Sequence, residues 1–365
     1  MIHAWLARNP RADRTRVYGP AQRAVVDAAN LPDIGMLGVV DKGPTPLLAL
    51  PALAERLGLG EVRVKDESQR FGFGAFKALG GVFAILQFMA SHGDRKPTDI
   101  VFTAASSGNH GRSVAMGAQL VGARCVILLP GFTSAEKEAA IRARGAEVIR
   151  IDGDYDTAIV ECRRRAEEKG WTIISDTSWP GYEIVPRDVM RGYTILADEI
   201  VRQWPQAPTH VLVQAGVGGL AAALIGYIWA VLPQRPMFVV VEPRSADCWF
   251  QSNAAGGPAP ASGDAGTMMG GLACREISPI TWPVVGLGAD WFMTIEEDEV
   301  MPARRQFARP LDGDPAIASG PSGCAGLAAL MRVCANGDAR RALRLDRDAR
   351  VLLINSEGNL GEAAP

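Results

Sequence analysis

The sequence has 365 residues, of which 48% are hydrophobic and 21% are charged, and its formal net charge is −2. A chain of this length and composition predicts a soluble globular protein of about two domains with a large buried core. The near-zero net charge provides no general attraction to nucleic acid or to an acidic membrane, so any bound anion needs a local site.

Targeting features are missing from the sequence. No apolar run reaches the roughly 18 residues of a membrane span, and the Arg-rich stretch 1–16 lacks the apolar centre of a signal peptide. Six cysteines are scattered without a CxxC motif, as is typical of thiols in a reducing compartment. We therefore expect a cytoplasmic protein that binds neither nucleic acid nor a membrane.

Short β-rich runs alternate with helix-like stretches along the chain. Strands are predicted near 62–64, 99–104, 125–130, 146–151, 172–175, 210–214, 237–242 and 350–354, and helices near 78–89, 111–121, 134–145, 155–170 and 219–232. Alternation of this kind predicts an α/β fold with mostly parallel sheets and crossover helices.

The first stretch with chemical character runs from Lys65 to Gly81. A strand leads into a glycine-rich loop that ends in Lys77, at the start of an apolar helix. The apolar neighbours, Phe73 and Phe76 among them, favour the neutral amine, which is the form that condenses with an aldehyde to give a Schiff base. Taken alone, a lysine that extends from a helix start to solvent explains the pattern at least as well.

The second stretch, Ala104 to Gly111, reads Ala-Ala-Ser-Ser-Gly-Asn-His-Gly and lies between a strand and a helix. Successive backbone N–H groups with a helix dipole behind them bind anions, so a carboxylate or a phosphate fits here. An ordinary strand–helix turn with a serine N-cap stays open as the alternative. His110 by itself is more typical of a structural role.

The third stretch, Val213 to Ala221, reads Val-Gln-Ala-Gly-Val-Gly-Gly-Leu-Ala and again joins a strand to an apolar helix. Its glycines allow the backbone to approach a phosphate. The stretch also matches the loose dinucleotide pattern GxGxx(G/A), and the next strand ends in Glu242, which could bind a ribose. A nicotinamide oxidoreductase is therefore the second hypothesis, although that pattern usually opens a domain rather than lying in mid-chain.

Together and in this order, the three stretches resemble the fold-type II pyridoxal phosphate (PLP) enzymes over roughly residues 40 to 360. Within that superfamily the chain is most similar to the diaminopropionate ammonia-lyases. The blocks that carry this resemblance are Arg70 to Gly81, Gly108 to Arg112, Asp176 to Tyr182, Gly271 to Cys274 and Ser356 to Gly358.

The resemblance implies a role for each matching residue. Lys77 would carry PLP as a Schiff base and move the Cα proton, and Asn109 would bind the phenolic oxygen of PLP. Gly216, Val217, Gly218, Gly219 and Leu220 would bind the PLP phosphate, and Ser356 would face the pyridine nitrogen. A hydroxyl cannot protonate that nitrogen as a carboxylate would, which suits elimination over long-lived carbanion chemistry.

Substrate binding is implied for the turn before the second helix, where Ser106, Ser107, Gly108 and His110 would hold the carboxylate of a small amino acid. Ser107, which we also predict to be catalytic, departs from the ammonia-lyases, which have an aspartate there that acts on the D-substrate. Since a serine is no charged base, we expect D-substrates to react poorly or differently. Asp176 is predicted to protonate or to pair with an amine leaving group, and a helix cap is the open alternative.

Other departures leave the leaving group open. Pro321 replaces a glutamate, and Asn359 with its two followers replaces Asp-Thr-Asp. The Mg²⁺ site of serine racemase maps onto Glu242, Ala246 and Cys248. Because a cysteine stands where that site has its aspartate, we expect no metal ion.

The sequence thus predicts a fold-type II PLP enzyme with a large PLP-binding domain (1–88 and 186–365) and a small domain (89–185), and the superfamily implies a homodimer. The expected reaction is α,β-elimination from 2,3-diaminopropionate to pyruvate and ammonia. Dehydration of serine, threonine or 3-hydroxyaspartate is the alternative within this chemistry. A PLP-binding protein without turnover and the nicotinamide oxidoreductase lie outside it.

Overall fold

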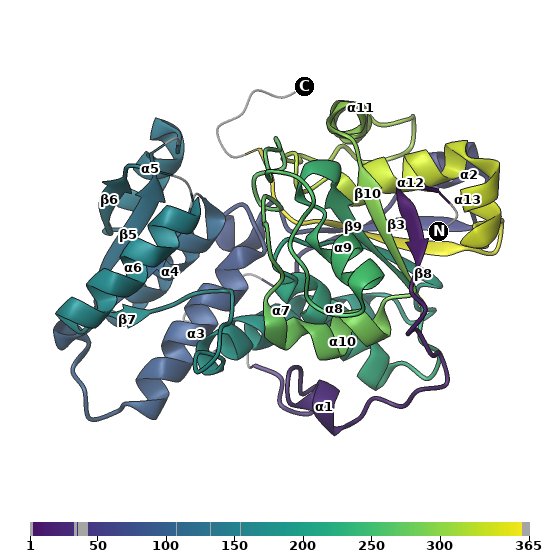
Figure 1. Ribbon diagram of the computed structural model, residues 1–365. Helices are drawn as coiled ribbons and strands as arrows, with labels where there is room; N and C mark the ends of the chain where they lie inside the picture. Colours follow the sequence, from purple (N-terminus) through teal and green to yellow (C-terminus); the bar gives the residue numbers. More distant parts are fainter. Residues whose placement is uncertain are drawn as a thin grey trace. The chain divides into compact units, whose positions relative to one another are not determined.

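The computed structural model describes residues 3–32, 35, 43–106, 108–131, 133–153 and 155–359. The chain forms two compact units (Figure 1). Unit 1 takes residues 1–30, 43–75 and 196–365, and unit 2 takes residues 31–42 and 76–195. Within the described ranges, no helix is both long and apolar enough to cross a membrane.

The units divide the chain after Ala75 and Ile195, whereas the sequence placed the divisions after residues 88 and 185. The first difference arises because helix α3 (Lys77–Ser91) packs along helix α4 (Asn109–Val121). An ideal Cβ on Gly117 would lie 3.1 Å from the Cα of Val82, so the two backbones are in close contact. The helix that begins with Lys77 therefore belongs to unit 2.

Unit 1 is built on a seven-stranded sheet with the order β1-β10-β9-β8-β11-β3-β2. The five inner strands are parallel, and the short edge strands β1 and β2 are antiparallel to their neighbours. The strands are β1 (Leu6–Arg8), β2 (Leu47–Ala49), β3 (Glu61–Asp66), β8 (His210–Gln214), β9 (Met237–Pro243), β10 (Trp291–Ile295) and β11 (Arg350–Asn355).

Eight helices accompany this sheet in the described part of unit 1. They are α1 (Pro20–Arg23), α2 (Pro51–Leu57), α8 (Gly219–Val231), α9 (Cys248–Ala255), α10 (Trp282–Gly288), α11 (Glu297–Ala308), α12 (Ala325–Ala335) and α13 (Gly337–Ala342). Helix α8 is buried from Gly219 to Trp229, as expected for a helix that is apolar on all sides. The apolar side chains of α12 join those of β3, β8 and β11 in the core of the unit.

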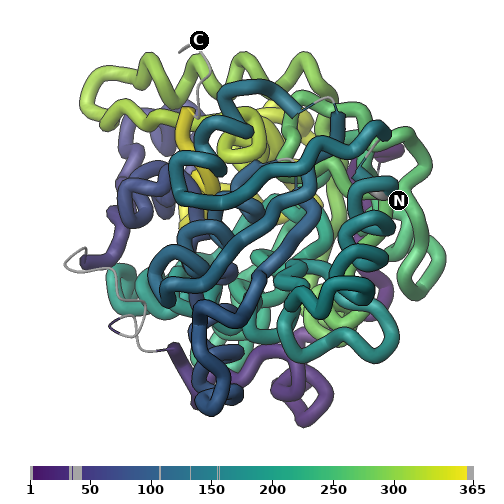
Figure 2. The backbone as a smooth tube through the Cα atoms, turned by 90° about the vertical axis from the view of Figure 1, so that its left-hand side faces the viewer, coloured from purple at the N-terminus to yellow at the C-terminus, as the bar shows by residue number. Residues whose placement is uncertain are grey.

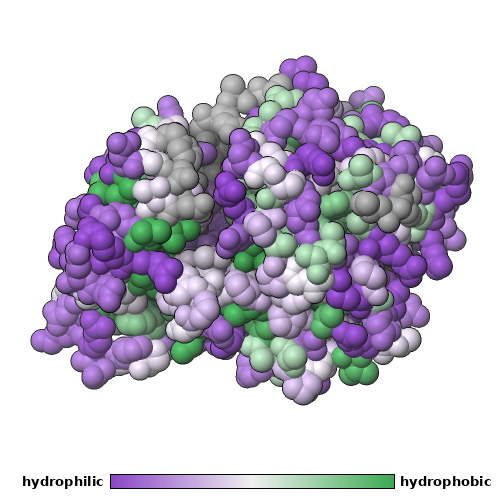
Figure 3. Space-filling view, viewed as in Figure 1, coloured by the Kyte–Doolittle hydropathy of each residue, from purple (hydrophilic) through white to green (hydrophobic). Residues whose placement is uncertain are grey.

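Unit 2 is built on a four-stranded parallel sheet with the order β6-β5-β4-β7. The strands are β4 (Val101–Ala105), β5 (Arg124–Pro130), β6 (Glu147–Ile151) and β7 (Thr172–Ile173), and the further helices are α5 (Ala135–Arg142), α6 (Tyr155–Lys169) and α7 (Ile184–Gln203), which continues into unit 1. Ala158 and Cys162 of α6 pack on Val126 and Leu128 of β5. The dark blue to teal tube in Figure 2 follows this unit, and Figure 3 shows mostly hydrophilic side chains over α6.

A closed network of buried charges follows strand β3 in unit 1. Arg70 donates to both oxygens of Glu67 and to both oxygens of Glu199, each at 2.7 Å. Lys65 Nζ lies 2.6 Å from Glu199 and also donates to Thr45 O and to a glutamine amide oxygen. Every proton of the lysine ammonium therefore has an acceptor, which is the condition for burying such charges without a large loss of stability.

Candidate functional site

Lys77 lies against a carboxylate inside unit 2. It is the first residue of α3, and its Nζ is 2.5 Å from Oδ2 of Asp176. The exposed fractions of the two side chains are 18% and 11%. Ser113 of α4 donates to the carbonyl oxygen of Lys77 at 2.6 Å, and the absence of a side chain at Gly81 makes room for that serine. The packing of α3 on α4 thus fixes the lysine at its position.

His110 is the third polar group of this cluster. Its Nε2 is 2.8 Å from the carbonyl oxygen of Ile174, so Nε2 carries the proton, and Nδ1 lies 3.8 Å from Asp176 Oδ2. Burial lowers the pKa of His110, with Asp176 partly opposing the shift. Burial alone would raise the pKa of Asp176, but His110 and Lys77 outweigh it and hold that pKa below its usual range. The carboxylate is therefore ionised at neutral pH.

The loop after β7 holds Asp176 in place. The Tyr182 hydroxyl donates to Ile173 O at 2.8 Å and accepts from the N–H of Ser175 at 3.0 Å. The rings of Trp179 and Tyr182 are stacked, with their centroids 4.0 Å apart. These two aromatic residues therefore close the loop around the aspartate, and the contacts of Tyr182 are with the backbone.

Tyr193 of α7 is a member of the cluster that sequence reasoning missed. Its ring centroid lies 4.7 Å from that of Phe76 and 5.9 Å from Lys77 Nζ. Burial raises the pKa of Tyr193, and the Lys77 charge opposes that rise. Gly80 and Gly192 allow the approach, because an ideal Cβ on Gly80 would lie 2.5 Å from the tyrosine ring. Glycines inside two helical segments were the only sequence signal for this contact.

The start of α4 uses the Ser106 side chain as a cap. Ser106 Oγ accepts from the N–H of Gly111 at 2.9 Å and from the N–H of Gly108 at 3.2 Å. Since the hydroxyl oxygen is occupied by the backbone, this serine shapes the turn. The groups of this turn that can bind an anion are backbone N–H groups. This agrees with the general rule that the residues before the first helical hydrogen bond have free N–H donors.

Three more residues of this turn were predicted to belong to the site, namely Asn109, His110 and Ser107. Asn109 opens α4, and its Oδ1 accepts from Arg112 Nη1 at 3.1 Å. His110 faces Asp176 as described above. Ser107, predicted as both a catalytic and a substrate-binding residue, lies outside the described residues.

In unit 1, the loop from residue 216 to residue 220 joins β8 to α8, and two of its positions accept only glycine. An ideal Cβ on Gly216 would lie 2.9 Å from Cys274 Sγ and 3.1 Å from a backbone oxygen. Gly218 has φ = +101°, and a Cβ there would lie 2.3 Å from the Trp249 ring. The indole of Trp249 also donates to Gly216 O at 2.9 Å. The loop is thus held tightly against its surroundings.

The same loop presents backbone donors at a helix start. The first N–H that bonds within α8 belongs to Ala222, which donates to Gly218 O at 2.8 Å. The N–H groups of residues 219–221 precede that bond and lie at the positive end of the helix dipole. This arrangement suits a phosphate group, because several donors and a partial positive charge meet at one point.

Ser356 follows β11 in the same unit. Its Oγ lies 3.1 Å from Gln214 Nε2, and that amide nitrogen also donates to Ser322 O and Ile354 O, both at 2.9 Å. An amide nitrogen has no lone pair to offer. The Ser356 hydroxyl proton is therefore directed to some other acceptor. A hydroxyl that donates a hydrogen bond to an unprotonated pyridine nitrogen needs its proton in this state.

The Glu242 carboxylate is used within the protein. It accepts from the N–H groups of Trp249 and Phe250, both at 2.8 Å, and from the Cys248 thiol. Burial raises the pKa of Glu242 well above its usual range. The side chain that the dinucleotide hypothesis required for a ribose thus caps helix α9 instead. In the described part of the chain, no group of three or more His, Cys, Asp and Glu could hold a metal ion.

Comparisons with known proteins agree with the PLP hypothesis. Residues 40–357 match the family model described as pyridoxal-phosphate dependent enzyme. The chain is 38% identical over 336 residues to the diaminopropionate ammonia-lyase of Escherichia coli K12, covering 87% of this chain and 84% of that enzyme. The resemblance stated from the sequence is therefore confirmed, and the nicotinamide oxidoreductase hypothesis finds no support.

Solved structures give the same answer. The holo form of the E. coli diaminopropionate ammonia-lyase aligns with a TM-score of 0.88 and 34% identity, covering 97% of this chain and 93% of that one. Its complex with D-serine aligns with a TM-score of 0.86 and 33% identity, covering 97% and 94%. The predicted α/β fold of this enzyme class is confirmed.

Proposed function

This chain belongs to the pyridoxal-phosphate-dependent enzymes, and on that premise we propose that it is an ammonia-lyase acting on 2,3-diaminopropionate. The products are pyruvate and two molecules of ammonia, with one water consumed. The observation that carries the choice of substrate is the ionised, buried carboxylate of Asp176 beside Lys77 Nζ.

The described residues fit the cofactor. The N–H groups of residues 219–221 and the tight glycine loop suit a phosphate, and Ser356 has a proton to donate to a pyridine nitrogen. Lys77 offers an amine at the surface of the apolar packing between α3 and α4. We assign Lys77, Asn109, Gly216, Val217, Gly218, Gly219, Leu220 and Ser356 as the residues that hold it.

When bound, pyridoxal phosphate supplies an aldehyde for amino groups and an electron sink for the bond that breaks at Cα. The chain's own residues handle protons and charges. Lys77 Nζ removes the Cα proton as a base. The backbone N–H groups at the start of α4, in the turn that contains Ser106 and Gly108, hold the substrate carboxylate, and we assign Ser107 and His110 to substrate binding as well.

Asp176 decides the leaving group in this proposal. A β-amino group of the substrate is already an ammonium ion at neutral pH, so it leaves without a further proton but needs a counterion. A β-hydroxyl leaves only with a proton from an acid. The charges that face Asp176, that of Lys77 among them, hold its pKa below its usual range, and in this proposal a substrate ammonium in the same place keeps the carboxylate ionised as its counterion. The substrate ammonium takes the position that Lys77 Nζ occupies against it.

The test is a substrate screen on the purified enzyme loaded with PLP. Release of pyruvate and ammonia is measured for L- and D-2,3-diaminopropionate, L-serine, L-threonine and 3-hydroxyaspartate. We expect diaminopropionate to give the highest kcat/KM, with two ammonia molecules per pyruvate. A higher kcat/KM for a hydroxy amino acid would establish the dehydratase alternative, and no keto acid from any substrate would leave a PLP-binding protein without turnover.

The L- and D-enantiomers of 2,3-diaminopropionate test the consequence of a serine rather than an aspartate at position 107. Because a serine provides no charged base, the D-enantiomer is expected to react more slowly than the L-enantiomer. Equal rates would contradict this expectation.

We further propose a homodimer in the cytoplasm. The dimer is carried by the family resemblance, and the location by the scattered cysteines, of which those in the described residues are all unpaired thiols. Size-exclusion chromatography with light scattering measures the first, and fractionation of cells that express the native gene measures the second.

A further inference from the structure

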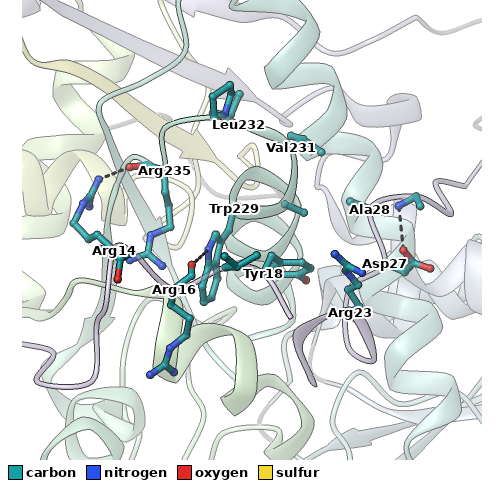
Figure 4. Close-up of a pocket in the computed structure, with 15 residues that line it drawn as sticks. Arg14, Arg16, Tyr18, Arg23, Asp27, Ala28, Trp229, Val231, Leu232 and Arg235 are labelled. Carbon is teal, nitrogen blue, oxygen red and sulfur yellow. Dashed lines mark hydrogen bonds between the residues drawn. The ribbon is translucent and has the colours of Figure 1, made fainter. Parts of the chain in front are cut away.

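A pocket of about 570 Å³ lies in unit 1, and none of the residues assigned above lines it (Figure 4). Its wall comes from the N-terminal segment 14–29 and from residues 229–235, where α8 ends and the next loop begins. Four arginines line it, namely Arg14, Arg16, Arg23 and Arg235, against one carboxylate, Asp27. We call it the arginine pocket. Among the described residues that line it, positive charge clearly exceeds negative charge.

Arg235 is the unusual member of this wall. The residue is 8% exposed, and its Nε, Nη1 and Nη2 atoms have no hydrogen-bond partner in the described part of the chain. Its guanidinium lies beside the Trp229 ring (Figure 4), at 4.6 Å from the ring centroid. Burial lowers the pKa of Arg235. Five N–H donors without acceptors are costly to bury, and contact with an aromatic face offsets only part of that cost.

The nearest carboxylate does not complete the site. Asp290 Oδ1 is 3.9 Å from Arg235 Nη2, which is too far for a hydrogen bond. Both oxygens of Asp290 accept from Arg14 Nη1, at 3.1 and 3.2 Å, and Oδ2 also accepts from the N–H of Phe238. The carboxylate is thus engaged by other donors.

The exposed arginines of the wall are not paired with acids. Arg16 and Arg23 are exposed, and neither makes an ion pair with a described residue within 4.0 Å. Asp13 lies close enough to influence both Arg16 and Arg235 electrostatically, and it keeps its negative charge while it accepts hydrogen bonds from Thr15. With Asp13, Asp27 and Asp290 set against the four arginines, one positive charge remains in excess around the arginine pocket.

We propose that the arginine pocket binds a small polyvalent oxyanion, either a phosphate compound or a polycarboxylate. A guanidinium presents two parallel N–H groups that match two oxygens of such a group. A nucleotide base is a poorer fit, because Trp229 already carries Arg235 on its face and Tyr18 at its edge. Since the Arg235 nitrogens are covered, the ligand shifts neighbouring side chains. Arg16 is a long, exposed side chain that rearranges at low cost, whereas Arg14 is held by Asp290 and by the carbonyl oxygen of Arg235.

The test is isothermal titration calorimetry on the PLP-loaded enzyme, at constant ionic strength in chloride, with inorganic pyrophosphate in one arm and citrate in the other. The visible spectrum is followed to show that the cofactor stays in place. The variants are Arg235→Gln and Arg16→Gln. Arg347→Gln is the matched control, because Arg347 is an exposed arginine of the same unit outside the pocket.

We expect one saturable site per chain for at least one anion, and the arm that saturates identifies the phosphate or the carboxylate class. Arg235→Gln should weaken binding about tenfold or more, Arg16→Gln by a smaller factor, and Arg347→Gln by less than about twofold. The absence of saturable heat with both anions would overturn the proposal, as would equal dissociation constants in all four proteins. If Arg235→Gln fails to fold, the exposed Arg16→Gln variant decides the outcome against the same control.

Discussion

Two lysine–carboxylate pairs of this molecule look alike in distance and differ in everything around them. Lys65 Nζ lies 2.6 Å from Glu199 in unit 1, and Lys77 Nζ lies 2.5 Å from Asp176 in unit 2. The Lys65 side chain is 0% exposed, and all three of its ammonium protons have acceptors. The Lys77 side chain is 18% exposed, and the Nδ1 atom of the neighbouring His110 has no hydrogen-bond partner among the described residues.

The contrast teaches that a short ion pair does not by itself mark an active site. A pair whose donors and acceptors are all satisfied and sealed from solvent has no capacity left for a ligand, so it stabilises the fold. A pair that a small molecule can reach, beside a polar atom that lacks a partner, can exchange one member for a substrate group. Substitutions in the two pairs separate these two cases.

The largest effect is expected from one substitution placed in each pair. Lys77→Met should lower kcat/KM for diaminopropionate by about 10³-fold or more, because the nucleophile and base are lost, while the protein stays folded. Lys65→Met should lower the free energy of unfolding by about 3–5 kcal/mol, because Glu199 loses a buried partner. Steady-state kinetics and urea unfolding measure the two. If Lys65→Met lowers kcat/KM per folded molecule as much as Lys77→Met does, the proposed difference between the two pairs is wrong.

A similar loss of stability is expected when the acid of the buried Lys65–Glu199 pair is replaced. Glu199→Gln leaves Arg70 and Lys65 with an incomplete set of negative partners, which should cost about 3 kcal/mol or more. Glu183→Gln is the matched control, because Glu183 precedes α7 and its side chain is 50% exposed. Urea midpoints measure both. A Glu199→Gln midpoint equal to that of the control would show that the network contributes nothing.

An intermediate effect on activity is expected when the acid of the partly exposed Lys77–Asp176 pair is replaced. Asp176→Asn should lower kcat/KM for diaminopropionate by about 10²-fold and should affect any activity on serine less, because a hydroxyl does not need the counterion. Asp152→Asn, at an exposed aspartate that follows β6 in the same unit, is the control. Equal losses on both substrates would contradict the counterion role and leave Asp176 as a structural residue.

The smallest effect concerns pH. Burial lowers the pKa of His110, so the unfolded state binds more protons than the folded state as the pH falls below the usual histidine pKa. The pKa of Asp176 is lowered as well, so its contribution is present at neutral pH and is lost only in strong acid. Stability should therefore fall from pH 7 to pH 5 through His110, by on the order of 1 kcal/mol. In His110→Asn this part of the slope should vanish, and an unchanged slope would assign it to another group.

Much of the fold could be predicted from local pattern. The strands near 125–130, 146–151 and 210–214 and the helices near 155–170 and 219–232 coincide with β5, β6, β8, α6 and α8 to within about a turn. Helix α7 was missed because Pro186 and Gly192 interrupt its pattern. A proline in the first turn sacrifices no helical hydrogen bond, and the glycine is required where Tyr193 and its neighbours meet α3.

The site divides in the same way. Lys77 and the loop at residues 216–220 follow from short motifs, since each lies where a strand or loop meets a helix, and Asp176 was predicted from the family resemblance. Tyr193 could not be predicted, because helix packing rather than sequence proximity brings it to Lys77. Ser106 shows a different limit. The motif predicted Ser106 as a substrate-binding residue, its hydroxyl caps α4, and only the geometry separates that role from ligand binding.

The order of the strands in unit 1 also has a consequence for how the protein is made. Strand β11, at residues 350–355, lies between β8 and β3 in the sheet, so within the described part of the chain strands β2 and β3 join the other strands only after β11 has been synthesised. Most of unit 2 is one continuous segment from residue 76 to residue 195, and that segment can fold while translation continues. The nascent protein should therefore carry an open, apolar sheet edge until residues 350–355 have left the ribosome, and this exposed edge is a risk for aggregation and proteolysis during synthesis.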